Sequence, residues 1–240
     1  MSKLSAICFL SKINTMNRNP FYILFPLIFV LACSNPNSQH ADQEKNDIEV
    51  KEPTTQKTKN ILFFGNSLTA GYGLENADEA FPGLIQKKID SLDLPYKVIN
   101  GGLSGETSAG GKERIDWLLK QEIDIFVLEL GANDGLRGLP VDETYNNLQA
   151  IIDKVKVAWP DCKIVLAGML VPPSMGQNYA ESFKAIFPKL ANENKLIFVP
   201  FLLENVAGEV TLNQQDGVHP TLEGQKILAE NVWKVLNPIL

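Results

Sequence analysis

Short apolar runs alternate with amphipathic stretches through residues 60–240, and this alternation is the strongest constraint on the fold. The apolar runs are typical of buried strands, and the stretches between them carry the spacing of helices with one apolar face. Strands that alternate with helices favour a parallel sheet, right-handed crossovers and helices on both faces. The predicted strands are 61–64, 96–100, 123–130, 163–170 and 196–201, and the predicted helices are 80–92, 113–120, 141–159, 182–194 and 221–236.

Length, charge and composition exclude several classes of protein. The chain has 240 residues with 45% apolar and 21% charged side chains, which is ordinary globular composition. Its net charge of −6 argues against a nucleic-acid partner, because such a partner requires a basic surface. Two histidines and three cysteines are too few for a three-histidine metal centre or a four-cysteine zinc site. No polar linker interrupts 60–240, so we expect one α/β domain there. We also expect the protein to be a monomer.

The N-terminal part has the features of a targeting segment and not those of a folded domain. Residues 1–32 have a basic start and end in an uncharged stretch, 21–32, which is too short to span a ~30 Å hydrocarbon core. This pattern is typical of a secretory signal. The sequence Val-Leu-Ala before Cys33 resembles the lipobox of bacterial lipoproteins, and the alternative is an ordinary secretory cleavage site. We expect an exported bacterial lipoprotein, membrane-anchored through lipid on Cys33, with the polar segment 33–59 as a disordered tether.

Polar, glycine-containing segments follow the predicted strands, at the edge of a parallel sheet where ligands bind. One of them contains Ser67, and the segment before the last helix contains Asp216 and His219. His219 is the only histidine in 60–240, so it is the only imidazole available to activate a serine. Asp216 lies three residues before His219, where a turn can bring its carboxylate to the imidazole. Taken one at a time, these residues have purely structural interpretations. Ser67 would be a turn residue, His219 a structural histidine and Asp216 a turn or helix-capping residue.

A serine hydrolase also needs donors for the developing oxyanion. Backbone N–H groups at Ser67 and Gly105 are candidates, and Asn133 offers an uncharged side-chain amide. Gly105 and Asn133 are also plausible as simple loop and turn residues. Cys162 is expected to be a small apolar residue rather than a nucleophile, because no second histidine is present to activate it.

Four segments, GNSLTAGYG, NGGLSGETS, GANDGLRG and DGVHP, resemble in order and spacing the four blocks of the SGNH (GDSL-type) hydrolases. The resemblance is strongest to the bacterial lysophospholipase, acyl-CoA thioesterase I and arylesterase branch. It implies a three-layer flavodoxin-like fold with a five-stranded parallel sheet in the order 2-1-3-4-5, and no cofactor. It also implies Ser67 as nucleophile, Asp216 and His219 as the rest of a triad, and Ser67, Gly105 and Asn133 as the oxyanion hole.

One position departs from the family pattern, because this chain has Asn66 where the family usually has Asp. That Asp is not a triad member, so we expect activity to be retained. An inactive protein whose Asn66→Asp variant is active would contradict this expectation.

Two apolar loops, 135–140 and 171–179, are expected to form the substrate site. The candidate contacts are Leu136, Arg137, Pro173 and Met175. The function expected is a serine esterase that hydrolyses lysophospholipid, aryl ester or acyl thioester through an acyl-serine intermediate. The alternatives are a carbohydrate deacetylase and a non-catalytic surface lipoprotein that binds a ligand.

Overall fold

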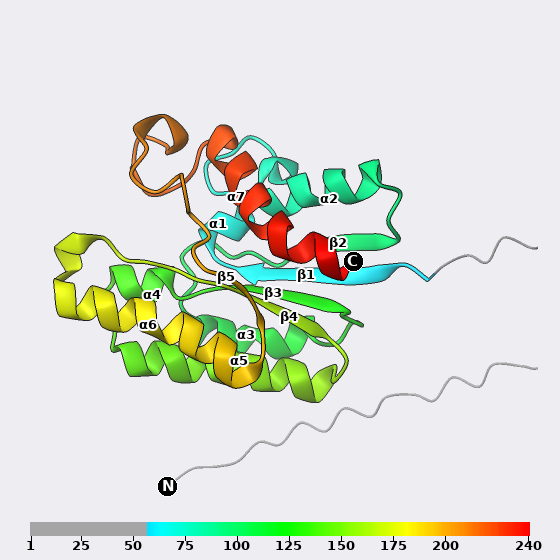
Figure 1. Ribbon diagram of the computed structural model, residues 1–240, viewed down its shortest axis with the longest axis horizontal. Helices are drawn as coiled ribbons and strands as arrows, with labels where there is room; N and C mark the ends of the chain where they lie inside the picture. The colour runs from blue at the N-terminus through cyan, green and yellow to red at the C-terminus, as the bar shows by residue number, and fades with distance from the viewer. Residues whose placement is uncertain (1–56) are drawn as a thin grey trace, which may run out of the picture. The chain divides into compact units, whose positions relative to one another are not determined.

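The computed structural model describes residues 57–240, so the predicted signal segment, Cys33 and nearly all of the predicted tether lie outside the described residues. Five parallel strands form one sheet in the order β2-β1-β3-β4-β5, which confirms the predicted fold class and strand order (Figure 1). The strands are β1 (Lys59–Gly65), β2 (Tyr96–Asn100), β3 (Ile125–Glu129), β4 (Lys163–Ala167) and β5 (Ile197–Val199).

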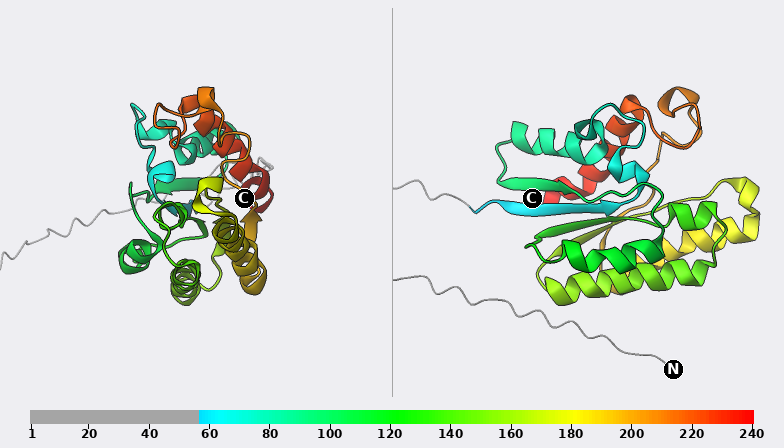
Figure 2. Two further views of the ribbon diagram at one scale, coloured as in Figure 1. Left: turned by 90° about the vertical axis from the view of Figure 1, so that its left-hand side faces the viewer. Right: turned by 180° about the vertical axis from the view of Figure 1, so that it is seen from behind.

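Helices cover both faces of the sheet and make a three-layer domain. Helices α2 and α7 lie on one face, and α3, α5 and α6 lie on the other (Figures 1 and 2). No helix within residues 57–240 is long and apolar enough to cross a membrane. The helices are α1 (Ser67–Ala70), α2 (Phe81–Ser91), α3 (Ser108–Leu118), α4 (Ala132–Leu136), α5 (Val141–Ala158), α6 (Gln177–Asn194) and α7 (Leu222–Leu236), with short 3₁₀ turns at Ala77–Glu79, Pro173–Met175, Val210–Leu212 and Asn237–Ile239.

The core explains why the strands read as continuous apolar runs. In β1, the four residues from Ile61 to Phe64 are fully buried, and every residue of β3 is buried as well. A strand in the middle of a sheet covered on both faces has no solvent side, so alternation of polar and apolar residues is not required. The same two-sided burial makes Glu129, the last residue of β3, conspicuous as a fully buried acidic side chain.

The element boundaries differ from the predictions at several ends. The strand β1 begins at Lys59, inside the segment predicted to be tether, and Lys57 already pairs with Glu122. Helix α3 begins at Ser108, five residues before the predicted start, because two glycines dilute its apolar pattern while Thr107 caps it through a bond from the Gly110 N–H. The predicted third, fourth and fifth strands are shorter in the structure, and α6 begins five residues before its predicted start.

The carboxyl ends of β1, β2 and β3 meet at one edge of the sheet, and the short helices α1 and α4 lie there. Neither short helix was predicted, because four or five residues are too few to show helical periodicity. This edge gathers the polar segments that the sequence analysis singled out.

Candidate functional site

Three side chains that are distant in sequence meet at the carboxyl edge of the sheet. Ser67 Oγ lies 2.9 Å from His219 Nε2, and His219 Nδ1 lies 2.6 Å from Asp216 Oδ2. Ser67 and His219 are separated by 152 positions in the chain, so only the fold brings them together. A hydroxyl, an imidazole and a carboxylate in this order can pass a proton from the serine to the histidine while the carboxylate orients the ring.

Ser67 sits at the turn between β1 and α1 and is 9% exposed. Asn66 caps α1, because its Oδ1 accepts the N–H of Leu68 at 3.0 Å. Substituting an asparagine cap by alanine typically costs about 1 kcal/mol of stability. The cap therefore fixes the direction in which the first residue of α1 presents its hydroxyl.

The Asp216 carboxylate is held by its own turn as well as by His219. Its Oδ1 accepts the N–H groups of Val218 and His219 at 2.9 and 3.0 Å. The hydrogen bond with the His219 side chain, followed by these two backbone bonds, lowers the pKa of Asp216 to about 2. The group is therefore ionised at neutral pH and accepts the proton on His219 Nδ1.

Each of the three predicted oxyanion donors has at least one hydrogen without an acceptor among the described residues. The N–H groups of Ser67 and Gly105 donate to no acceptor in the part of the chain that the structure describes. Gly105 has a φ of +80°, a conformation that favours glycine over any residue with a side chain. Asn133 Nδ2 donates one hydrogen to the Glu106 carbonyl at 2.9 Å, and this leaves the second hydrogen of the amide free.

An ion pair between Glu106 and Arg114 holds the loop that carries Gly105. The Glu106 carboxylate is 3% exposed and accepts two bonds from Arg114, at 2.7 and 2.6 Å. Arg114 also donates to the Gly101 carbonyl at 2.9 Å and lies over the Phe64 ring at 4.5 Å. A paired, nearly buried carboxylate fixes the backbone of Glu106, to which Asn133 is bonded.

An apolar cavity of about 550 Å³ adjoins Ser67 and His219. No lysine, arginine, aspartate or glutamate is among the described residues that line it. Its apolar wall is made mainly by Met169, Leu170, Val171, Pro172, Pro173 and Phe201. Such a wall accommodates an uncharged, apolar group next to the Ser67 hydroxyl.

The predicted substrate contacts separate into two groups. Leu136 and Pro173 line the cavity. Arg137 and Met175 are not among the residues that line it, so their contact with substrate stays a prediction. The Arg137 guanidinium donates to the Gly105 carbonyl at 3.0 Å, and Met175 packs against the core near Gly138.

Sequence reasoning did not identify several residues that shape the site. The Tyr72 ring lies 4.5 Å from the His219 ring. The Gln214 side chain donates to the Tyr72 and Pro220 carbonyls at 2.7 and 3.0 Å, which ties the serine segment to the histidine segment. Glu129 lies under the serine turn, and its one signal was a single acid in an otherwise apolar strand. Tyr72 lies inside the GNSLTAGYG block, but neither Tyr72 nor Gln214 was singled out as a site residue.

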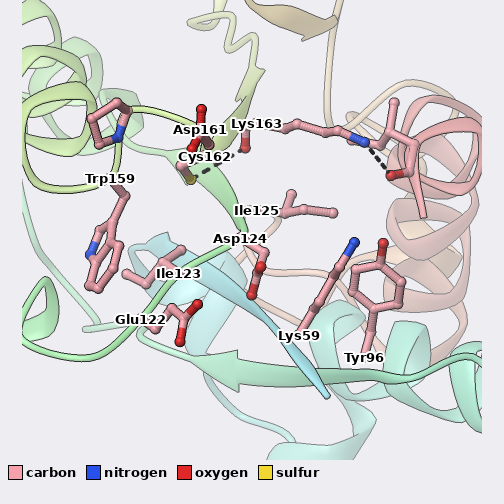
Figure 3. A pocket seen from close by; sticks show the side chains of 12 residues that line it. Lys59, Tyr96, Glu122, Ile123, Asp124, Ile125, Trp159, Asp161, Cys162 and Lys163 are labelled. Atoms are coloured by element: carbon pink, nitrogen blue, oxygen red, sulfur yellow. Dashed lines mark hydrogen bonds between the residues drawn. The ribbon is translucent and has the colours of Figure 1, made fainter. Parts of the chain in front are cut away.

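A second cavity, of about 420 Å³, lies at the opposite end of the sheet, where β1, β3 and β4 begin (Figure 3). Cys162 lies in it and donates through Sγ to the Lys163 carbonyl at 3.7 Å. Burial raises the pKa of the Cys162 thiol to about 12, so it stays protonated at neutral pH. A protonated thiol is a poor nucleophile, which supports the structural reading of this cysteine.

Comparison with known proteins places this geometry in a family. Residues 63–227 match the model of the GDSL-like Lipase/Acylhydrolase family. Esterase TesA of Pseudomonas aeruginosa is 38% identical over 181 residues, which are 75% of this chain and 89% of that protein. The Escherichia coli protein named thioesterase 1/protease 1/lysophospholipase L1 is also 38% identical over 181 residues, 75% of this chain and 84% of its own length.

A solved structure agrees with these sequence relatives. The psychrotrophic esterase EstA from Pseudoalteromonas sp., in a structure inhibited by monoethylphosphonate, superposes with a TM-score of 0.71 at 33% identity, covering 75% of this chain and 98% of that chain. The alternative of a non-catalytic binding lipoprotein is therefore set aside. The chain belongs to the GDSL-like lipase/acylhydrolase (SGNH hydrolase) family and is an ester-hydrolysing enzyme.

Proposed function

We propose that this enzyme cleaves acyl esters through an acyl-serine intermediate on Ser67. The observation that carries the proposal is the continuous line of hydrogen bonds from Ser67 Oγ to His219 and on to Asp216, open to an apolar cavity. Only His219, among the residues that the structure describes, supplies an imidazole.

In the acylation half, His219 Nε2 takes the proton of Ser67 as Oγ attacks the ester carbonyl carbon. The bonds of Asp216 to His219 favour the tautomer with the proton on Nδ1 and stabilise the imidazolium that forms. The carbonyl oxygen becomes negative and is bound by the N–H groups of Ser67 and Gly105 and by the Asn133 amide. The C–O or C–S bond then breaks, and the imidazolium gives its proton to the departing alcohol or thiol.

In the deacylation half, water takes the place of the leaving group. His219 Nε2 accepts a proton from this water as its oxygen attacks the acyl carbon. The same three donors bind the second oxyanion. The Ser67–acyl bond then breaks, Ser67 Oγ regains the proton from His219, and a carboxylic acid leaves.

The cavity favours an uncharged acyl group as the part of the substrate held inside. A charged group would lose its hydration in a cavity without a charged partner, and this costs several kcal/mol. Any phosphate or other charged part of the substrate must therefore remain outside, on the leaving-group side. Lysophospholipids, aryl esters and acyl thioesters all meet this requirement.

The test is a panel of p-nitrophenyl esters from acetate to decanoate, with a lysophospholipid and an acyl thioester, assayed with wild type, Ser67→Ala and Ser182→Ala. Ser182 is an exposed serine on α6 and is the matched control. Turnover should be lost only in Ser67→Ala, and a p-nitrophenyl phosphonate should add mass to wild type at Ser67. Absence of turnover with every substrate would refute the proposal. A preference for acetyl groups would favour a carbohydrate deacetylase instead.

We also propose that the enzyme is exported and anchored to a membrane through lipid on Cys33. The proposal rests on the sequence of the first 33 residues, which lie outside the described part of the chain. Two acyl chains or an equivalent second signal are needed for stable anchoring. The Cys33→Ala variant should hydrolyse esters normally and leave the membrane fraction. Retention of that variant on membranes would instead indicate an uncleaved signal anchor.

A further inference from the structure

Glu129 is a buried acid that the acyl-transfer chemistry does not use. It ends β3, beside the end of β1, and is 0% exposed. Its Oε2 accepts the Asn66 N–H at 3.0 Å and the Thr69 hydroxyl at 2.8 Å. Asn66 and Thr69 flank Ser67 along the chain. One carboxylate oxygen therefore holds the backbone before the serine and the helix turn after it.

Glu129 lies so close to the turn that there is no space for a side chain at Gly65. A Cβ built on Gly65 would lie 2.5 Å from Glu129 Oε2 and 2.2 Å from Thr69 Oγ1. Such distances are far inside van der Waals contact, so the strand end, the carboxyl and the first turn of α1 are packed around one point. A displacement of Glu129 would be transmitted directly to the backbone that presents Ser67.

This arrangement is costly for the folded protein. Burial raises the pKa of Glu129 to about 7, against the opposing effects of hydrogen bonds from Thr69 and Asn66. Glu129 Oε1 and Asn66 Nδ2 are both buried without a hydrogen-bond partner among residues 57–240. Buried unpaired groups of this kind are rare and need an explanation in the role of the site.

Two other titratable side chains of the site, His219 and Glu106, have partners other than Glu129 among residues 57–240. His219 faces Ser67 and Asp216, and Glu106 pairs with Arg114. Glu129 accepts hydrogen bonds from two groups, the Thr69 hydroxyl and the Asn66 backbone N–H.

We propose that Glu129 is a positioning residue for the Ser67 nucleophile, acting through its shared bonds to Asn66 and Thr69. The inference rests on the proposed acyl-serine chemistry. It predicts that Glu129 affects how fast Ser67 reacts and not how well the acyl group binds, because the side chain does not line the cavity.

The experiment compares kcat and KM for a p-nitrophenyl ester in wild type, Glu129→Ala, Glu129→Gln, Thr69→Val and the Glu129→Ala/Thr69→Val double variant. Misplacing a reacting group by about 1 Å costs on the order of 10²-fold, so Glu129→Ala should lower kcat about 10–100-fold with KM within about 3-fold. Glutamine keeps an acceptor oxygen, so Glu129→Gln should recover kcat to within about 5-fold of wild type. Because the Thr69 hydroxyl is proposed to act through its bond to Glu129, its removal should add nothing once Glu129 is truncated, and the double variant should be no slower than Glu129→Ala.

Two controls separate positioning from loss of stability. Ile89→Ala truncates a fully buried side chain near the end of α2 and should lower the melting temperature while leaving kcat unchanged. Hydrogen exchange at the Asn66 amide should speed up in Glu129→Ala and not in Ile89→Ala, and this readout does not depend on catalysis.

Each outcome decides the proposal. An unchanged kcat in Glu129→Ala, a change confined to KM, or a glutamine variant as slow as the alanine variant would overturn it. Unchanged exchange at the Asn66 amide would overturn it as well. A wild type that hydrolyses no substrate refutes the proposed acyl-serine function instead, and the exchange measurement still tests the contact of Glu129 with the turn.

Discussion

The buried Glu129 carboxyl makes the stability of this enzyme depend on pH, and Glu129→Gln should remove that dependence. The pKa of Glu129 is raised from 4.5 to about 7 in the folded protein because burial disfavours its charged form. Between these two values the folded state holds a proton that the unfolded state has released. Raising the pH therefore favours unfolding. The contribution is fully present below about pH 4.5 and is lost as the pH rises through about 7.

The size of the effect follows from the shift. One pKa unit corresponds to 1.36 kcal/mol, so a difference of about 2.5 units amounts to about 3 kcal/mol of unfolding free energy. For a domain of this length that corresponds to a decrease of about 6–12 °C in melting temperature. The titration of Asp216 does not overlap with that of Glu129. Its pKa is lowered to about 2, so its contribution is present above its ordinary pKa of 3.8 and is lost only as the pH falls through 2.

The assay is denaturant and thermal unfolding of wild type and Glu129→Gln at several pH values from about 4.5 to 8. Wild type should lose about 3 kcal/mol relative to the glutamine variant across this range, since glutamine does not titrate. The difference between the two proteins isolates this one group from the other acids. Parallel stability curves for the two proteins would refute the reasoning and show that the Glu129 pKa is not raised by burial.

Three further predictions concern the groups around Ser67. Asn133→Ala should lower kcat about 10²–10³-fold with little change in KM, as expected when one oxyanion donor is removed, and a normal kcat in an ester assay would exclude that role. Asp216→Asn should lower kcat about 10⁴-fold, because an amide favours the wrong imidazole tautomer, and a loss below tenfold would contradict the proposed triad. Arg137→Ala should lower kcat about 3–10-fold for all esters alike, because the arginine bonds the Gly105 carbonyl. A rise in KM confined to lysophospholipid would instead show that Arg137 binds the phosphate.

Much of the fold was predictable because its signals are local. Each strand is a short apolar run, and each long helix carries a periodic apolar face. The sheet order came from the family resemblance and was confirmed by the structure. The ends of elements were less predictable. Helix α3 has two glycines in its first turn, which interrupt the apolar pattern, and α1 and α4 are too short to show one.

The identities of the candidate site residues were also visible in the sequence. Ser67, Gly105, Asn133, Asp216 and His219 were singled out by their places after strands, by the single domain histidine and by the four family blocks. The contacts that these residues make could not be predicted from the sequence. Arg137, a predicted substrate contact, donates to the Gly105 carbonyl, and this bond depends on how the fold brings the two loops together.

The sequence by itself determined the alternation of strands and helices, the family, and the serine, histidine and aspartate available for chemistry. Only the tertiary structure decided which of these groups are hydrogen-bonded to each other and which groups are buried at a cost in folding free energy. Ser67 and His219 meet across 152 positions, and Glu129 reaches Thr69 across 60. Contacts of this kind depend on the packing of parallel strands against each other. Burial, which raises the pKa of Glu129, is likewise a property of three-dimensional surroundings that no local pattern encodes.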